Sequence, residues 1–336
     1  MNKLWIAAAM LLGAAVLAAG CGGTSDESGG SASGSGSTKL ALAAYSTPRE
    51  AYAELIPAFA KTPQGSGVSI SQSYGASGEQ SRAVESGLPA DVVAFSLAPD
   101  VTRLVEAGIV AEDWASDDHD GMVTDSVVVF AVRKGNPKNI ETWDDLLRDD
   151  VDVITPNPFT SGGARWNVMA AYGAQLKQGK SKDEAVQYLR DLFANVSVQD
   201  KSARESLQTF SSGKGDVLIA YENEAITAQQ AGQPLDYTIP DQTILIENPV
   251  AVTKDAPEQA QAFVDYLRTP EAQKVFAEKG YRSILPDVLD EETYPTPQTL
   301  FTIADLGGWE AVSSEFFDRE DGIFADIQRE LGEPTE

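Results

Sequence analysis

Short apolar segments rich in β-formers alternate with helix-like segments along most of this chain, and this alternation is the feature that most restricts its fold. The successive strand and helix pairs are residues 39–45 and 48–60, 67–74 and 79–86, 91–95 and 101–107, 127–132 and 143–147, and 151–155 and 163–175. Strands separated by helices form parallel sheets with helical crossovers. The sequence therefore predicts an α/β fold.

The N-terminus has the pattern of a lipoprotein signal. Lys3 precedes an apolar run over residues 4–20, which ends in small residues directly before Cys21, the only cysteine in the sequence. The run is short for a membrane-spanning helix. We expect a signal peptide over residues 1–20, a lipidated Cys21 and an extracytoplasmic chain anchored to the outer face of the cell membrane. Residues 22–38 are mainly Gly, Ser, Thr and Ala, so residues 21–38 are expected to form a flexible tether.

The remaining length and charge limit the function. About 300 residues beyond the leader predict two lobes with separate cores. The formal net charge of −26 makes nucleic acid an improbable partner and repels small anions at long range. An anion site in this chain must therefore use short-range, directed hydrogen-bond donors.

Ligands of open parallel sheets bind beyond the C-terminal ends of the strands, so the helix starts that follow strands are candidate sites. Three of these starts have the spacing of a capping box, in which a hydroxyl caps the helix and an acid or amide turns back to it. These pairs are Thr47 with Glu50, Ser77 with Gln80, and Ser202 with Glu205. Most capping boxes only cap helices.

The helix start at Ser161, Gly162 and Gly163 is different because it has no capping acid and two glycines in its first turn. Each glycine costs roughly 1 kcal/mol relative to alanine inside a helix. That cost is explained if a ligand must approach the backbone closely. Free N–H groups and the helix dipole favour an anion there.

The chain resembles the sulfate-binding proteins that serve ABC importers, over nearly everything after the tether. The motifs that carry the resemblance are Gly75-Ala76-Ser77-Gly78, the run from Val132 to Lys138, the run from Ile154 to Asn167, the run from Gly215 to Glu224, and Leu300-Phe301-Thr302-Ile303 before Gly307-Gly308-Trp309. The resemblance implies a two-lobed type II periplasmic-binding-protein clamshell, each lobe a mixed, mainly parallel sheet flanked by helices. We expect lobe 1 to comprise residues 39–125 and 246–336, and lobe 2 residues 126–245.

The resemblance also implies how the anion is held: by backbone N–H groups, serine hydroxyls and an indole N–H, without a cationic side chain. Carried over by position, the ligand-binding residues are Ser46, Ser77, Ser161, Gly162, Gly163, Ala203 and Tyr221. Ser46 replaces an aspartate found in many members, and Tyr221 replaces the indole. Tyr221 is equally explained as a packing aromatic. Arg49, Arg165 and Arg204 are expected to pair with loop acids or to stiffen the lobes.

Sulfate is the leading ligand because it carries no proton at neutral pH, so its site needs donors only. Phosphate benefits from an acceptor for its proton, although hydroxyls can also accept. Thiosulfate stays open as the main alternative, and molybdate is less favoured. The expected partners are a membrane permease of an ABC importer and the anion itself, and we expect a monomer.

Two other classes of protein fit the sequence less well. An oxyanion-processing enzyme is disfavoured because His119 is the only histidine and lies in an acidic turn, with no Walker-type loop or histidine-rich metal motif. Asp117, Asp118 and Asp120 are weak candidates for a cation site, because exposed acidic runs are usually only solvated. A structural surface lipoprotein leaves the glycine pair unexplained. We expect no cofactor, no metal and no catalysis.

Overall fold

The computed structural model describes residues 37–290 and 292–335. The predicted signal peptide, Cys21 and residues 22–36 of the tether lie outside the described residues. The strands are β1 Thr38–Tyr45, β2 Val68–Gly75, β3 Val92–Ala94, β4 Met122–Arg133, β5 Val153–Ile154, β6 Val196–Val198, β7 Val217–Tyr221, β8 Leu235–Thr238, β9 Gln242–Val252 and β10 Thr299–Phe301. The α-helices are α1 Arg49–Phe59, α2 Ser77–Glu85, α3 Ala98–Glu106, α4 Gly162–Lys177, α5 Lys182–Ala194, α6 Ala203–Ser211, α7 Glu222–Gln230, α8 Glu258–Leu267, α9 Pro270–Glu278, α10 Gly308–Phe317 and α11 Ile323–Leu331.

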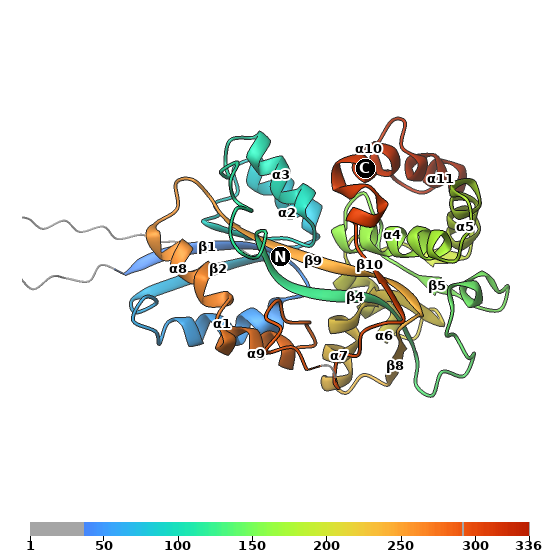
Figure 1. Cartoon of the computed structure of the whole chain (residues 1–336), viewed down its shortest axis with the longest axis horizontal. Helices are drawn as coiled ribbons and strands as arrows, with labels where there is room; N and C mark the ends of the chain where they lie inside the picture. The colour runs from blue at the N-terminus through green and yellow to red at the C-terminus, as the bar shows by residue number, and fades with distance from the viewer. Residues whose placement is uncertain (1–36, 291, 336) are drawn as a thin grey trace, which may run out of the picture. The chain divides into compact units, whose positions relative to one another are not determined.

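The predicted α/β fold is confirmed. The described strands join in one 10-stranded sheet with the order β2-β1-β3-β9-β4-β7-β5-β6, to which β8 is added beside β4 and β10 beside β9. Strand β1 pairs in parallel with β2 and β3, and β5 pairs in parallel with β6 and β7. Helices cover both faces of the sheet, with α2 and α3 opposite α1, α8 and α9 (Figure 1). The predicted helix at residues 143–147 is a 3-10 helix, η1 Trp143–Leu147.

Strands β4 and β9 are the long central pair of the sheet. Residues 122–127 of β4 pair antiparallel with residues 245–249 of β9, and the far end of β9 pairs with β3 while the far end of β4 pairs with β7. The strand predicted at residues 127–132 is thus longer, because its first half is paired with β9. The expected lobe boundaries, between residues 125 and 126 and between residues 245 and 246, fall on this ladder.

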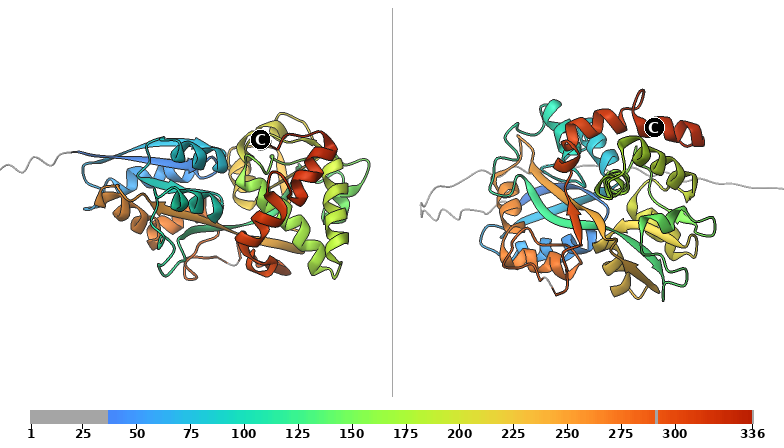
Figure 2. Two further views of the ribbon diagram at one scale, coloured as in Figure 1. Left: turned by 90° about the horizontal axis from the view of Figure 1, so that it is seen from above. Right: turned by 45° about the vertical axis from the view of Figure 1, so that its right-hand side comes forward.

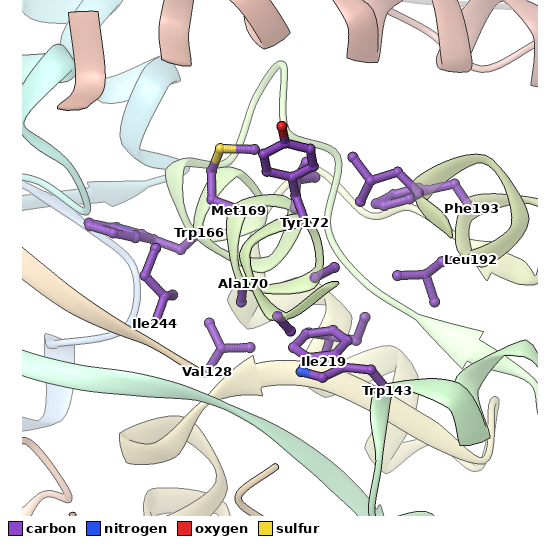
Figure 3. Packing of buried hydrophobic residues seen from close by; sticks show 14 of the residues in the cluster. Val128, Trp143, Trp166, Met169, Ala170, Tyr172, Leu192, Phe193, Ile219 and Ile244 are labelled. Carbon is purple, nitrogen blue, oxygen red and sulfur yellow. The ribbon is translucent and has the colours of Figure 1, made fainter. Parts of the chain in front are cut away.

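Two large groups of apolar side chains form on the two sides of that ladder. One group joins β1, α1, α8 and α9, and includes Leu42, Leu55, Phe263 and Phe276. The other surrounds α4, which is buried on nearly all sides because its faces are filled by apolar and small residues. Figure 3 shows side chains from several elements, including Trp143, Ile219 and Ile244, packed around this helix.

The last two helices pack with the middle of the chain. Rings of Tyr172 and Phe316 lie 4.7 Å apart, and those of Phe193 and Phe324 lie 4.6 Å apart, between α4, α5 and the pair α10 and α11. Figure 2 shows α10 and α11 beside these helices. Helices α8 and α9 instead pack with α1, as expected. The division into lobes stays a prediction. Residues 299–336 were expected in lobe 1, but α10 and α11 within them pack against α4 and α5 of the expected lobe 2.

Within the part of the chain that the structure describes, no helix is long and apolar enough to cross a membrane.

Candidate functional site

A small cavity lies where the starts of α1, α2, α4 and α6 converge with the ends of β3 and β7. Its empty space, including the part that is open to solvent, is about 230 Å³. Its lining residues are Tyr45, Ser46, Thr47, Gly75, Ala76, Ser77, Ser96, Ser161, Gly163, Ser202, Ala203 and Tyr221. The convergence follows from the topology, since parallel strands bring their C-terminal ends to one edge of the sheet.

The structure brings six of the seven predicted ligand-binding residues to this cavity. They are Ser46, Ser77, Ser161, Gly163, Ala203 and Tyr221. Gly162 is absent from the lining, because it packs against the segment after β3: a Cβ added there would lie 2.8 Å from the Ser96 hydroxyl and 2.7 Å from a Leu97 methyl. That these residues contact an anion stays a prediction.

The start of α4 has the predicted form. Ser161 is the N-cap, and its hydroxyl accepts a hydrogen bond of 3.4 Å from the Ala164 N–H. A Cβ on Gly163 would meet Tyr221 and Ala203 at 3.5 and 3.6 Å, so this glycine faces the cavity. The first turn of a 16-residue helix therefore presents backbone N–H groups and the positive end of its dipole beside the cavity.

The predicted capping box of Ser77 with Gln80 is wrong. Ala76 is the N-cap of α2 and makes no side-chain cap, while the Ser77 hydroxyl donates to Asp100 Oδ2 at 2.5 Å and accepts from the Ser96 N–H at 3.0 Å. Gln80 instead accepts from the Ser73 hydroxyl. The Ser77 hydroxyl is thus committed as a donor to Asp100, a buried residue whose pKa is raised by burial. What Ser77 can offer the cavity is its backbone N–H at the start of α2.

The capping box of Thr47 with Glu50 is also wrong, because Glu50 binds a partner from another helix. The Arg204 guanidinium donates to both carboxylate oxygens of Glu50, at 2.8 and 2.5 Å, and to the Ser46 carbonyl at 3.3 Å. This ion pair joins α1 to α6 beside the cavity. Arg204 lowers the pKa of Glu50, although burial opposes the shift. Arg204 thus pairs with an acid, as expected, but the acid lies in the first turn of α1 and not in a loop.

The third capping box is confirmed in part. Ser202 caps α6 by accepting from the Glu205 N–H at 3.2 Å, but the Glu205 carboxylate accepts from the Lys201 N–H instead of turning back to Ser202.

None of the described cationic side chains lines the cavity. Arg165 donates to the Pro158 carbonyl at 2.9 Å and lies over the Phe317 ring, and Arg49 lies over the Tyr74 ring. The polar groups that do line the cavity are hydroxyls and backbone groups. Such a set can bind an anion through directed donors, which is the kind of site expected for an acidic chain.

Tyr221 belongs to the lining through a hydrogen bond with another hydroxyl. Its phenol oxygen lies 2.7 Å from the Ser96 hydroxyl, and either can donate. The Ser96 carbonyl is fixed by the Trp166 indole at 2.8 Å and the Asn248 amide at 3.0 Å. Burial raises the pKa of Tyr221 well above its ordinary value, so the phenol keeps its proton.

Several lining residues escaped the sequence reasoning as ligand candidates: Tyr45, Thr47, Gly75, Ala76, Ser96 and Ser202. Thr47 and Ser202 carried a signal as candidate helix caps, and Ser96 follows a strand directly. The Thr47 hydroxyl is buried without a hydrogen-bond partner among the described residues. It is therefore an available donor at the cavity.

The acidic turn after α3 forms no metal cluster. Asp117 accepts from the N–H groups of His119 and Gly121 at 2.8 and 3.2 Å and pairs with Arg268 at 2.9 Å. Among the described residues, no group of three or more His, Cys, Asp or Glu side chains is arranged to hold a metal ion.

Comparison with known proteins places this geometry in context. Residues 40–282 match the family described as bacterial extracellular solute-binding protein. The chain is 42% identical to a sulfate-binding protein of Synechococcus elongatus over 96% of this chain and 95% of that protein. It is 38% identical to a thiosulfate-binding protein of Escherichia coli, covering 83% and 88%. The solved structure of the sulfate-binding protein SubI from Mycobacterium tuberculosis H37Rv matches with a TM-score of 0.81 and 45% identity, over 84% of this chain and all of that one.

Proposed function

This chain belongs to the family of bacterial extracellular solute-binding proteins, and we propose that it captures sulfate and delivers it to an ABC importer. One observation carries the proposal: the cavity at the converging helix starts is lined by hydroxyls and backbone groups, and by none of the described cationic side chains. Relatives named as sulfate-binding proteins, at 42% and 41% identity, support the same ligand.

The proposed ligand contacts come from both sides of the cavity. Ser46 and Ser77 supply backbone N–H groups from the starts of α1 and α2. Ser161, Gly162, Gly163 and Ala203 supply donors from the starts of α4 and α6, and Tyr221 or Ser96 supplies a hydroxyl. Gly162 contributes its backbone alone, since its Cα side packs on Ser96 and Leu97.

Donors without a carboxylate acceptor favour a fully deprotonated anion. No Asp or Glu side chain of the described residues lines the cavity, so a monohydrogen phosphate finds only hydroxyl oxygens to accept its proton. Sulfate needs no acceptor. Thiosulfate is the second candidate, because relatives at 38% and 35% identity are named thiosulfate-binding proteins.

Capture between two lobes follows the arrangement of the sheet. We assign residues 39–125 and 246–298 to lobe 1 and residues 126–245 to lobe 2, joined by the ladder of β4 with β9. Residues 299–336, first expected in lobe 1, go with lobe 2 because α10 and α11 pack on α4 and α5. The Arg204 and Glu50 ion pair then bridges the lobes at the closed cavity.

Delivery to a transporter also implies where the chain acts, how it is anchored and what it binds besides the anion. The chain acts as a monomeric receptor without catalytic activity, outside the cytoplasm, held to the membrane by a lipid on Cys21. Its partner is the permease of an ABC importer.

Calorimetric titration of the purified full-length chain in detergent, with sulfate, thiosulfate, phosphate and molybdate, tests the ligand. We expect one binding site that prefers sulfate to phosphate. Absence of heat with both sulfate and thiosulfate contradicts the proposal, and a clear preference for thiosulfate replaces sulfate with the second candidate.

A further inference from the structure

A second, larger hollow lies between α3 and α10, and it shares no lining residue with the cavity described above. Its empty space, including the part that is open to solvent, is about 1760 Å³. Its lining includes Arg103 from α3, Arg165 from α4 and Arg319 from the segment after α10. Trp309, Ser313 and Phe317 follow one another at four-residue intervals on α10, so one face of that helix forms a wall. We name this hollow the arginine cleft.

The guanidinium groups of the arginine cleft are close enough to repel one another. Burial lowers the pKa of Arg165 to about 10; Asp100 opposes the shift, whereas Arg103, Arg82 and Arg319 add to it. Burial likewise lowers the pKa of Arg82, and Arg319 and Arg103 lower it further. The three arginines of the lining and Arg82 beside them thus gather in one place in a chain with a net charge of −26.

The local acids neutralise these cations poorly. Arg103 meets Glu85 only at 3.9 Å, and within residues 37–290 and 292–335 the side chains of Arg82 and Arg319 have no ion pair or hydrogen bond. The Arg103 Nε and the Ser313 hydroxyl are buried without a partner among the described residues. An unpaired buried donor costs about 1–3 kcal/mol, so a ligand that supplies acceptors there recovers that cost.

The distribution of charge around the cleft distinguishes a small anion from an acidic protein surface. Glu106, Glu310, Asp318 and Glu320 also line the cleft, and all four are exposed. Exposed carboxylates repel an extended acidic surface, but a small anion can pass between them to Arg103 and Arg165, which are half-buried, and to Arg319, which is exposed. Planar guanidinium forks pair with two oxygens of a phosphate or sulfate group at once.

We propose that the arginine cleft is a second anion site, which takes a small polyvalent oxyanion of the phosphate or pyrophosphate class between Arg103, Arg165 and Arg319. Helix α3 belongs to lobe 1, whereas α4 and α10 pack in lobe 2. An anion held by arginines of both sides therefore joins the lobes and favours the closed cavity. By linkage, the second anion raises the affinity of the first site for sulfate.

Titration with inorganic pyrophosphate tests the site on the full-length chain in detergent, with one equivalent of sulfate already present. The test variant is Arg103→Gln with Arg319→Gln, and the charge-matched control is Arg148→Gln with Arg190→Gln, two arginines outside the cleft. We expect one pyrophosphate per chain, at least tenfold weaker binding in the test variant, and unchanged binding in the control. Sulfate alone is expected to bind both variants and the wild type equally.

Two results overturn the proposal: no pyrophosphate binding to the wild-type chain, or an equal loss of binding in the test and control variants. Thermal unfolding of each variant establishes that it is folded. Because sulfate is titrated separately, failure of the arginine cleft and failure of the sulfate cavity give different results.

Discussion

The hydroxyl groups of Ser96 and Tyr221 lie 2.7 Å apart at the wall of the cavity and form one hydrogen bond. Two hydroxyls that share one bond use one proton between them, so the other proton stays free to donate. Whichever group donates within the pair, one O–H remains for the anion. We therefore propose that the pair supplies the side-chain donor that the resemblance assigns to an indole.

This relationship predicts unequal effects of single and double substitutions. In Tyr221→Phe or Ser96→Ala the surviving hydroxyl can still donate, so each change weakens sulfate binding by about 0.5–1.5 kcal/mol. The double variant loses the last proton, and its loss exceeds the sum of the single losses. Calorimetric affinities of the four proteins give the coupling energy. If the double variant binds sulfate as tightly as either single variant, the Ser96 and Tyr221 hydroxyls do not contact the anion.

Substitution of Gly163 is predicted to separate folding from binding. A methyl group fits here, since its nearest neighbours lie at 3.5 Å or beyond, but it enters the cavity toward Tyr221 and Ala203. We expect Gly163→Ala to stabilise α4 by up to about 1 kcal/mol and to weaken sulfate binding by tenfold or more, about 1.4 kcal/mol. Thermal unfolding and calorimetry measure the two effects.

The matched control is Gly179, which follows the C-terminal end of α4 and does not line the cavity. A Cβ added there would meet open space. Gly179→Ala places alanine at a φ of +87° and is expected to lower stability without changing sulfate affinity. Equal affinities of the Gly163 variant and the wild type show that Gly163 does not face the anion.

Much of this site was predictable because its signals are local. The start of α4 at Ser161 to Gly163 follows from capping and glycine preferences, and the strand order brings the other helix starts beside it. The wrong capping boxes show where local reasoning ends. Glu50 and Ser77 lie in correct local patterns, yet Arg204 and Asp100, distant in the sequence, offer stronger partners. Ser96 carried no pattern, because a single serine after a strand is too common to signal a ligand.

The Arg204 and Glu50 ion pair predicts a salt-sensitive affinity. The two side chains are 28% and 36% exposed, so the pair contributes at most about 1 kcal/mol. If closure of the cavity uses this pair, Glu50→Gln weakens sulfate binding by about two- to fivefold at low salt and by less at high salt. The control is Asp236→Asn, which breaks an exposed pair with Lys134 away from the cavity. Equal responses of both variants contradict a role for Glu50 in closure.

Asp125 predicts a stability that falls with rising pH. Burial, with a smaller contribution from Glu247 across the ladder of β4 with β9, raises the pKa of Asp125 to about 7 against the opposing effect of Arg282. The unfolded chain, with a pKa near 3.9, loses this proton first, so between about pH 4 and 7 the folded state holds more protons and its free energy of unfolding falls as pH rises.

Asp125→Asn removes this contribution and is expected to flatten the pH dependence, with a gain of up to about 4 kcal/mol at pH 8 relative to the wild type. Denaturant unfolding at pH 5 and pH 8 measures the difference. The exposed Asp149→Asn serves as the control and keeps the wild-type slope. An unchanged slope for the Asp125 variant shows that this carboxyl is ionised throughout.

The continuous ladder of β4 with β9 limits how the proposed lobes can move apart when the anion is released. Two covalently unbroken strands join the proposed lobes, and the ladder between them keeps its backbone hydrogen bonds if the strands only twist. Opening then resembles torsion of a ribbon, with an elastic restoring force, more than free swinging about a loose linker. We expect such a collective motion to take microseconds to milliseconds. A receptor built in this way returns to one preferred open conformation after each release, and can then bind the next anion.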